Sequence, residues 1–265
     1  MQQYPYWHKQ TIDTPLYPDI EWNKPEQRTK AGKLGIIGGN KLGFAGVAEA
    51  FSTSLKTGAG EAKVLLPAAL KKTIPPVFTE TVFAPSNISG SLSRDALGDM
   101  KALGEWSTGI LLVGDAGRSS ETAIAYDDFI ASYSGWITFT RDAVDLVKQS
   151  SSVLVDREKT LFVVSFAQLQ KLFQQVYYPR MLTFSMQLAN VVDSLHKFTI
   201  TYPITIVTLH KDHLLVAHGG EVVTMEWGNP MAIWRGNTAA KAATYLLWNN
   251  DRPLEAITSA VIETS

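Results

Sequence analysis

The sequence predicts an α/β protein with a mostly parallel central sheet, helices on both faces of the sheet and an antiparallel edge. Three observations lead to this prediction. Short apolar runs alternate along the chain with segments of helical period, which is the pattern of strand–helix–strand units. The apolar runs are continuous, as expected of strands that are covered on both faces. Near the end of the chain, strand-like runs follow one another through a Gly-Gly turn, which favours antiparallel pairing there.

Residues 1–30 precede the regular pattern. They are rich in Tyr, Trp, Pro and charged residues and have the period of neither a helix nor a strand. We therefore expect an aromatic N-terminal arm over 1–30 and a single domain over 31–265, because no repeat or linker divides the remainder. The arm has too many aromatic residues for a free tail, and we expect these to pack on the domain or on a second subunit: Tyr4, Tyr6, Trp7, Tyr17 and Trp22.

The regular pattern begins with a strand at 34–37, a small-residue helix at 46–58 that ends at a glycine cap, and a strand at 62–67. The later strands are predicted at 80–84, 109–114, 135–139 and 160–164, and within 204–227 around the turn Gly219-Gly220. The later helices are predicted at 94–106, 120–132, 141–150, Met181 to Lys197, 237–250 and 253–265.

Charge and cysteine content exclude several classes of function. The chain has 24 Lys and Arg against 25 Asp and Glu, a net charge of -1, so it lacks the basic excess of a nucleic-acid-binding protein. No apolar run reaches the roughly 18 residues of a membrane helix, and residues 1–11 do not resemble an export signal. We therefore expect no membrane partner and a soluble, cytoplasmic protein. With 0 Cys, disulfides, thiolate metal sites and a cysteine nucleophile are excluded.

Glycine-rich turns after the predicted strands are the candidate ligand sites, because such turns direct N–H groups and helix N-termini at anions. The turns run from Gly38 to Gly46, from Gly114 to Arg118, and from Gly228 to Thr238. None of them matches the Walker or the dinucleotide-binding pattern. The alternative remains open that these glycines serve only positive φ angles and close helix packing.

The histidines and serines give no further site. His210 and His213 are three residues apart in a predicted strand, so their side chains point to opposite faces and do not converge on a metal with His218. A G-x-S-x-G nucleophile elbow is absent. We therefore predict no metal site from the histidines and no serine-hydrolase chemistry.

The order of the glycine motifs resembles that of the ADP/ATP-dependent NAD(P)H-hydrate dehydratases, a carbohydrate-kinase-like family with the ribokinase-like fold. Lys33 to Pro67 is similar to the start of that family, and Gly114 to Gly117 is similar to its G-P-G-L-G turn. The segment NPMAIWRGNTAAKAA, from Asn229, is similar to the family's N-P-G-M-A-T-G-G-T-G-D loop and helix. Asp142 falls on the second acid of its D-A-D-A-L segment, where Thr140 replaces the first.

This resemblance implies a three-layer ribokinase-like fold and a two-step reaction, in which the hydrated nicotinamide cofactor is phosphorylated and phosphate then leaves. It implies ATP or ADP, with Mg²⁺, as cofactor, NAD(P)H hydrate as substrate, and association into a homo-oligomer. The implied catalytic positions are Asn237 and Thr238, which match the family's Asp, and Asp142. The implied nucleotide- and phosphate-binding residues are Asn229, Arg235, Gly236, His210 and Lys211. The implied substrate-binding residues are Gly38, Gly39, Asn40, Gly46, Gly114, Asp115 and Gly117.

The departures from the family fall at its catalytic positions. The family's Gly-Asp supplies N–H donors for the phosphate and a carboxylate base, but the matching stretch from Arg235 to Thr238 contains no acid. Asn and Thr cannot take up a proton near neutral pH. Val164 to Gln168 stands where the family has P-H-P-G-E, so its His and Glu are missing too. Trp234 is expected to fill space that phosphate oxygens need, and Arg235 to supply positive charge.

We therefore expect a degenerate dehydratase homologue with weak or no activity, and an Asp at position 237 or 238 is expected to raise residual activity if only the base is missing. Three alternatives stay open. The first two are an active dehydratase and a small-molecule kinase, each with Asp142 or Asp115 as an unconventional base. The third is a nucleotide-binding or structural subunit.

Overall fold

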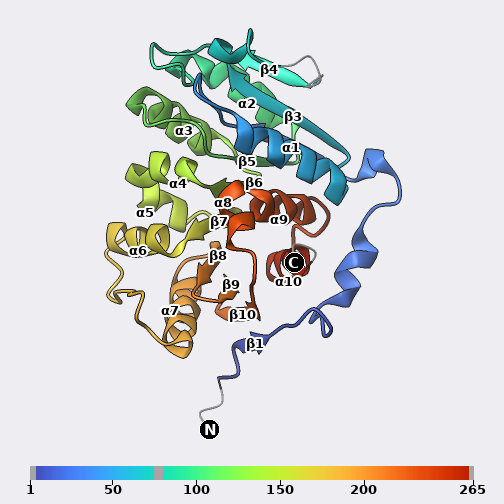
Figure 1. Ribbon diagram of the computed structural model, residues 1–265, viewed down its shortest axis with the longest axis vertical. Coiled ribbons are helices and arrows are strands. Elements are labelled where there is room, and N and C mark those ends of the chain that lie inside the picture. The colour runs from blue at the N-terminus through green and yellow to red at the C-terminus, as the bar shows by residue number, and fades with distance from the viewer. Residues whose placement is uncertain (1–3, 75–79, 263–265) are drawn as a thin grey trace.

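The computed structural model describes residues 4–74 and 80–262, and in this part of the chain ten strands form one sheet (Figure 1). In chain order the strands are β1 (Trp7–Lys9), β2 (Lys33–Ile37), β3 (Glu61–Pro67), β4 (Thr81–Ala84), β5 (Gly109–Leu112), β6 (Trp136–Thr140), β7 (Thr160–Ser165), β8 (Thr205–His210), β9 (His213–His218) and β10 (Glu221–Glu226). Across the sheet their order is β1-β10-β9-β8-β7-β6-β5-β2-β3-β4.

The sheet from β4 to β8 is parallel throughout, and β9 is antiparallel to both of its neighbours, β8 and β10. The turn between β9 and β10 is Gly219-Gly220, with φ of 58° and 87°. Both residues have the positive φ that glycine tolerates and that a two-residue hairpin requires. The predicted α/β class, with its mostly parallel sheet and antiparallel strands at one end, is therefore confirmed.

The helices are α1 (Ala45–Thr57), α2 (Leu97–Trp106), α3 (Ser120–Ser132), α4 (Asp142–Leu146), α5 (Ser151–Val155), α6 (Phe166–Gln175), α7 (Leu188–Thr201), α8 (Pro230–Arg235), α9 (Asn237–Trp248) and α10 (Pro253–Ile262). Local sequence explains several of their ends. The side chain of Ser119 accepts a hydrogen bond from the Thr122 N–H at the start of α3, and α1 ends at Gly58 with φ of 113°. No helix of the described residues is long and apolar enough to span a membrane.

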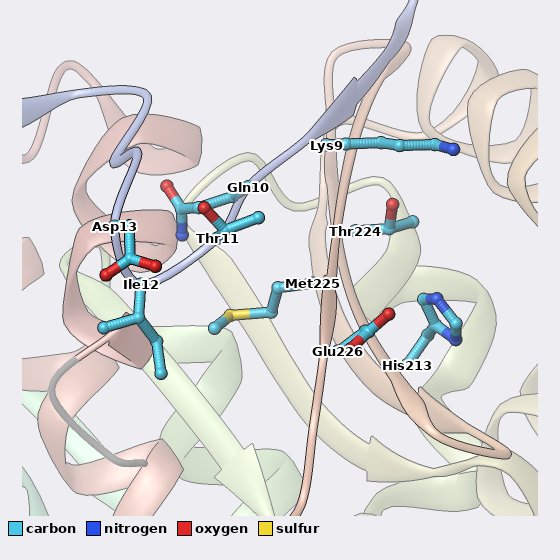
Figure 2. A pocket seen from close by; sticks show the side chains of 9 residues that line it. All are labelled: Lys9, Gln10, Thr11, Ile12, Asp13, His213, Thr224, Met225 and Glu226. Atoms are coloured by element: carbon cyan, nitrogen blue, oxygen red, sulfur yellow. The ribbon is translucent and has the colours of Figure 1, made fainter.

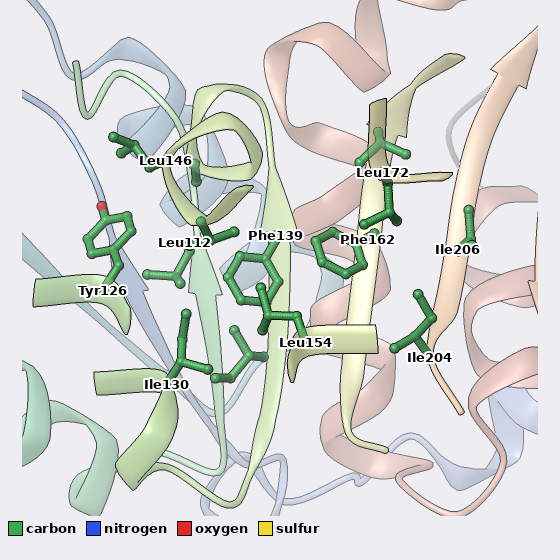
Figure 3. Packing of buried hydrophobic residues seen from close by; sticks show 14 of the residues in the cluster. Leu112, Tyr126, Ile130, Phe139, Leu146, Leu154, Phe162, Leu172, Ile204 and Ile206 are labelled. Carbon is green, nitrogen blue, oxygen red and sulfur yellow. The ribbon is translucent and has the colours of Figure 1, made fainter. Parts of the chain in front are cut away.

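The helices cover the sheet in two layers. Helices α2 to α7 pack on one face over a core rich in aromatic residues, in which Phe139 of β6 and Phe162 of β7 stack at 5.1 Å (Figure 3). Helices α1, α8, α9 and α10 pack on the other face. Helix α9 lies centrally there because its buried side chains are small, which lets its backbone approach α1, α10 and the sheet: Ala239, Ala240, Ala242 and Ala243.

The structure differs from the sequence prediction in the arm. Residues Trp7–Lys9, for which no strand was expected, form β1 and pair in parallel with β10. The chain then runs along the outside of the molecule (Figure 1) to β2, which lies between β5 and β3. A three-residue strand has no period of its own, so its formation depends on contacts with β10 and α7 that the local sequence does not reveal.

The helix expected from Met181 to Lys197 is shifted in the structure. Helix α7 begins at Leu188 and runs to Thr201, just before Tyr202-Pro203. The preceding residues form a loop because their carbonyl groups bond to side chains of other elements. Gln170 Nε2 donates to the Leu182 oxygen at 2.7 Å, and His210 Nε2 lies 2.9 Å from the Met186 oxygen.

Helices α6 and α8 were not predicted, although each carries a start signal in the sequence. At α6, Ser165 and Gln168 form a capping box. At α8, Pro230 occupies the first turn. Both helices matter for the site, because they overlap the segments that differ most from the dehydratase motifs: α6 includes Phe166 to Gln168, and α8 includes Trp234 and Arg235.

Candidate functional site

The first two glycine turns meet at the carboxyl edge of the sheet, because β2 and β5 are neighbouring parallel strands. The Gly39 N–H donates to the Gly114 oxygen at 3.3 Å, and Asn40 Nδ2 donates to the Asp115 oxygen at 2.5 Å. Asn40 Oδ1 in turn accepts from the Leu42 N–H at 2.7 Å. The polar groups of Asn40 are therefore bonded within the chain.

Asp115 joins the second turn to two other elements. Its Oδ2 accepts a hydrogen bond from the Gly46 N–H, in the first turn of α1, at 2.7 Å. Its Oδ1 lies 2.5 Å from Nη2 of Arg141, which directly follows β6. The carboxylate thus lies at a helix N-terminus, where negative charge is favourable, and forms an ion pair with a guanidinium.

Asp142 completes this cluster. Its Oδ1 accepts a hydrogen bond from the Asp115 N–H at 2.6 Å. Burial, its largest influence, raises the pKa of the Asp142 carboxyl above the usual value, and the backbone hydrogen bonds to it act in the opposite direction. Because this carboxyl holds a proton more readily than an exposed one, it is a candidate for general acid or base chemistry.

Two glycines in the cluster are needed to admit these side chains. A Cβ atom at Gly46 would lie 2.2 Å from Arg141 Nη1, and one at Gly114 would lie 1.9 Å from Asp142 Oδ1. Both distances are far below van der Waals contact. At these two positions, the glycine makes room for a charged side chain from the end of β6.

The backbone of the cluster is strained at two residues. Asp115 has φ of 62° and Arg141 has φ of 55°, values that residues other than glycine rarely adopt. The Arg141 oxygen is held by Gln168 Nε2 of α6 at 2.8 Å. Strained residues that the surrounding structure fixes in this way are typical of functional sites.

The third turn reaches the cluster at Gly236, which ends α8 and precedes α9 with φ of 93°. A Cβ atom at Gly236 would lie 3.8 Å from both Arg141 Cδ and Val113 Cγ1. Asn237 Oδ1 and Thr238 Oγ1 are buried and have no hydrogen-bond partner among the described residues. The start of α9 therefore combines N–H groups that have no partner within the helix with two polar side-chain atoms that lack one.

Three cavities adjoin this region. A cavity of about 370 Å³ lies beside Arg141 and is lined by Asp115, Thr140, Arg141, Asp142, Asp145, Val163, Ser165, Gln168, Ile233 and Trp234. A second, of about 510 Å³, shares Asp142 and Asp145 with it and also contains Gly117, Arg118, Lys148 and Lys171. A third, of about 320 Å³, contains Asn229 and Asn237 with Lys56 and Lys241.

The remaining sequence-predicted residues do not all join the cluster. Arg235 is exposed at the end of α8 and lines none of these cavities. His210 is buried against Phe166, and Lys211 lies in the turn between β8 and β9 with φ of 54°. Trp234 is 57% exposed on α8 and borders the cavity beside Arg141. Asn237 lines the cavity that also contains Lys56 and Lys241.

A cavity at the other end of the sheet contains none of the predicted site residues. It has a volume of about 390 Å³ and lies between the segment that follows β1 and the end of β10 (Figure 2). Figure 2 shows Gln10 and Met225 on one side of β10 and Lys9 and His213 on the other. Gln10 is buried with both ends bonded, since its Nε2 donates to the Thr258 oxygen and its Oε1 accepts from the Leu16 N–H.

Sequence reasoning missed two residues of the cluster, Arg141 and Gln168. Arg141 carried a visible signal, because it directly follows a buried strand at the edge where ligands bind in parallel sheets. Gln168 belongs to the capping box of α6, but its bond to the Arg141 oxygen joins residues 27 positions apart and could not be read from the sequence.

Comparisons with known proteins support the fold. No family model and no curated protein sequence matches the chain. A ribokinase-like superfamily protein from Enterococcus faecalis matches with a TM-score of 0.74 at 16% identity, over 100% of this chain and 88% of that one.

Two further solved structures have stated activities. An ADP/ATP-dependent NAD(P)H-hydrate dehydratase from Bacillus subtilis, co-crystallised with ATP and Mg²⁺, matches with a TM-score of 0.58 at 14% identity, over 89% of this chain and 79% of that one. A phosphomethylpyrimidine kinase from Clostridium difficile matches with a TM-score of 0.58 at 11% identity, over 88% of this chain and 98% of that one. The chain therefore has the ribokinase-like fold that the sequence resemblance implied.

Proposed function

We propose that this chain is a nucleotide-binding homologue of the ADP/ATP-dependent NAD(P)H-hydrate dehydratases in which dehydratase activity is weak or absent. One observation carries the proposal: the first turn of α9 has Asn237 and Thr238 where that family has its Asp. A general base contributes about 10²–10⁴-fold to such a reaction, so its loss leaves slow turnover at best.

The substrate turns support the loss of activity. Among the residues that the resemblance assigns to substrate binding, Asn40 and Gly46 both donate to Asp115, whose carboxylate also pairs with Arg141. A substrate hydroxyl would have to replace these charge-assisted bonds with bonds of equal strength. Such a site is less open to substrate than one with free donors.

Nucleotide binding is supported by the start of α9. Its N–H groups provide donors, and the cavity that Asn237 lines provides space for phosphate oxygens. Among the described residues, no group of three or more His, Cys, Asp or Glu could hold a metal ion. We therefore expect Mg²⁺, which often binds through substrate phosphates, to arrive with the nucleotide.

A small-molecule kinase is the second candidate function, and Asp142 favours it. This carboxyl has a raised pKa and lines both the cavity beside Arg141 and the larger cavity next to it. An acceptor hydroxyl in the larger cavity could give its proton to Asp142. The kinase proposal requires a different acceptor, because nothing in that cavity identifies hydrated NADH.

The two candidates are tested with the purified protein in Mg²⁺. Calorimetry with ATP, ADP, AMP and NADH measures binding, and absorbance at 340 nm follows hydrated NADH incubated with ATP or ADP. We expect nucleotide binding with little or no gain in absorbance. Rapid recovery of NADH would refute the loss of activity, and the absence of any nucleotide binding would refute the proposal as a whole.

A further inference from the structure

We propose that Arg141 binds the terminal phosphate of a nucleotide, or inorganic pyrophosphate in its place, at the start of α9, and that Asp115 positions the guanidinium for this contact. The inference rests on the proposed nucleotide binding and adds to it a positively charged side chain, that of Arg141, which directly follows β6. The D-A-D-A-L segment of the dehydratases has an alanine at the position that matches Arg141. The resemblance to that family therefore does not imply this contact.

The location of Arg141 is the first argument. Its Cδ is 3.8 Å from the point where a side chain at Gly236 would begin, so the side chain passes directly beside the first turn of α9. It lines the cavity of about 370 Å³ together with Thr140, whose hydroxyl is buried without a hydrogen-bond partner among the described residues. Thr238, in the first turn of α9, has a second such hydroxyl, but it is fully buried and lines none of these cavities. Arg141 and the Thr140 hydroxyl therefore line one cavity, and both can donate to phosphate oxygens.

The chemistry of the guanidinium is the second argument. Of its N–H donors, the described residues engage one, on Nη2, through Asp115. The side chain is 25% exposed, so its remaining donors are shielded from bulk solvent without being sealed from the cavity. A guanidinium in this setting forms stronger bonds to phosphate than one in water.

The way in which Arg141 is held is the third argument. Its φ of 55° is unfavourable, yet Gln168 fixes its oxygen, Asp115 fixes its Nη2, and Gly46 leaves room for its Nη1. A charged side chain that only needed solvent would require none of these features. Together they hold the guanidinium in one orientation before a ligand arrives, which lowers the entropic cost of binding.

Arg235, the arginine that the sequence indicated for this role, provides a matched control. It is exposed and lines none of the cavities beside the cluster. Both arginines can be changed to glutamine, which removes the charge and keeps a side chain of similar length.

The test compares Arg141→Gln, Arg141→Lys and Arg235→Gln with the unmodified chain by calorimetry, using ADP, pyrophosphate and adenosine, after thermal unfolding has verified that each variant is folded. We expect Arg141→Gln to weaken ADP and pyrophosphate binding about 10-fold or more, the effect of one charge-assisted hydrogen bond. Adenosine, which has no phosphate, should bind equally to all four proteins. The affinity of Arg141→Lys for ADP should lie between those of Arg141→Gln and the unmodified chain. Arg235→Gln should bind ADP within about 2-fold of the unmodified chain.

The outcomes separate this inference from the proposed function. If ADP binds and Arg141→Gln leaves its affinity unchanged, the role of Arg141 is wrong and the proposed function stands. If no nucleotide binds but pyrophosphate binds in an Arg141-dependent way, the proposed function fails and the phosphate site stands. If the unmodified chain binds neither compound, or if Arg141→Gln unfolds and Arg141→Lys binds like the unmodified chain, the inference is overturned.

Discussion

At the residue scale, burial as well as charge determines how the carboxyl groups of the cluster at the carboxyl edge of the sheet hold their protons. Asp115 and Asp142 lie next to each other, but only Asp115 has a cationic partner, Arg141, at hydrogen-bond distance. Asp142 relies on backbone N–H donors, and burial raises its pKa. The Asp142 carboxyl is therefore expected to change protonation at a higher pH in the folded than in the unfolded chain.

Asp142→Asn tests this difference. The pKa of Asp142 is higher in the folded than in the unfolded chain, where it is about 4. Between these two pKa values the folded state binds more protons, so the free energy of unfolding falls as pH rises through the folded pKa. Asn is neutral at every pH, so the variant should gain stability relative to the unmodified chain between pH 4 and 7. Urea unfolding at both pH values measures the gain, and a difference that is equal at the two would contradict the assignment.

The two positions at which the resemblance implies an Asp also differ in their surroundings. Thr238 is fully buried, whereas Asn237 lines the cavity with Lys56 and Lys241. Thr238→Asp should lower the unfolding free energy by about 3–5 kcal/mol, because it buries a carboxylate without a partner, and Thr238→Ser is the control. Asn237→Asp should fold normally and still convert no hydrated NADH back to NADH, since its carboxylate would lie beside the lysines. Restored turnover in Asn237→Asp would show that only the base was missing.

At the element scale, β1 is held on the edge of the sheet by side chains more than by its short ladder. Tyr6 stacks on His196 of α7 at 3.5 Å between ring centroids, and its hydroxyl donates to Asp193 Oδ1 at 3.1 Å. Burial and the nearby Asp193 raise the pKa of Tyr6 to about 12. Trp7 Nε1 donates to Thr224 Oγ1 of β10 at 2.8 Å. Tyr6 and Trp7 of the arm thus pack on the domain, whereas Trp22, which was expected to pack as well, is 89% exposed.

Tyr6→Ala should therefore destabilise the protein by about 2 kcal/mol, less than truncation of a fully buried aromatic ring. Tyr6→Phe keeps the stack and should lose about 1 kcal/mol, the value of the hydroxyl bond. Urea unfolding gives both values. Equal losses in the two variants would mean that the stack adds nothing to the attachment of β1.

At the scale of the whole molecule, a ligand at the start of α9 touches elements from both halves of the chain. Arg141 follows β6 and Gly236 precedes α9, so bound phosphate would link them. At 100 times its dissociation constant, ADP with Mg²⁺ should raise the unfolding free energy by about 2.7 kcal/mol. Thermal unfolding with and without ADP measures this. An unchanged melting temperature at millimolar ADP would argue against nucleotide binding.

Association into a homo-oligomer is a further proposal at this scale. Apolar side chains are exposed between α6 and α7, where Tyr177 is 92%, Met181 72% and Phe184 61% accessible. Such a cluster favours a protein interface. Light scattering should give a mass that is a multiple of that of one chain, and Phe184→Ser with Met181→Ser should reduce it. A monomer at all concentrations would contradict this proposal.

The sequence by itself determined the fold class, because continuous apolar strands, helical periods and glycine caps are local signals that the packed sheet agrees with. It also located the glycine turns and the two positions, Asn237 and Thr238, at which the resemblance implies an Asp. Only the tertiary structure decided which groups meet there, that Arg141 rather than Arg235 lines the cavity beside the cluster, and that the arm contributes β1. Contacts such as Arg141–Asp115 and β1–β10 join residues that are 26 and more than 200 positions apart. Their formation depends on how the sheet is assembled, and no local pattern encodes it.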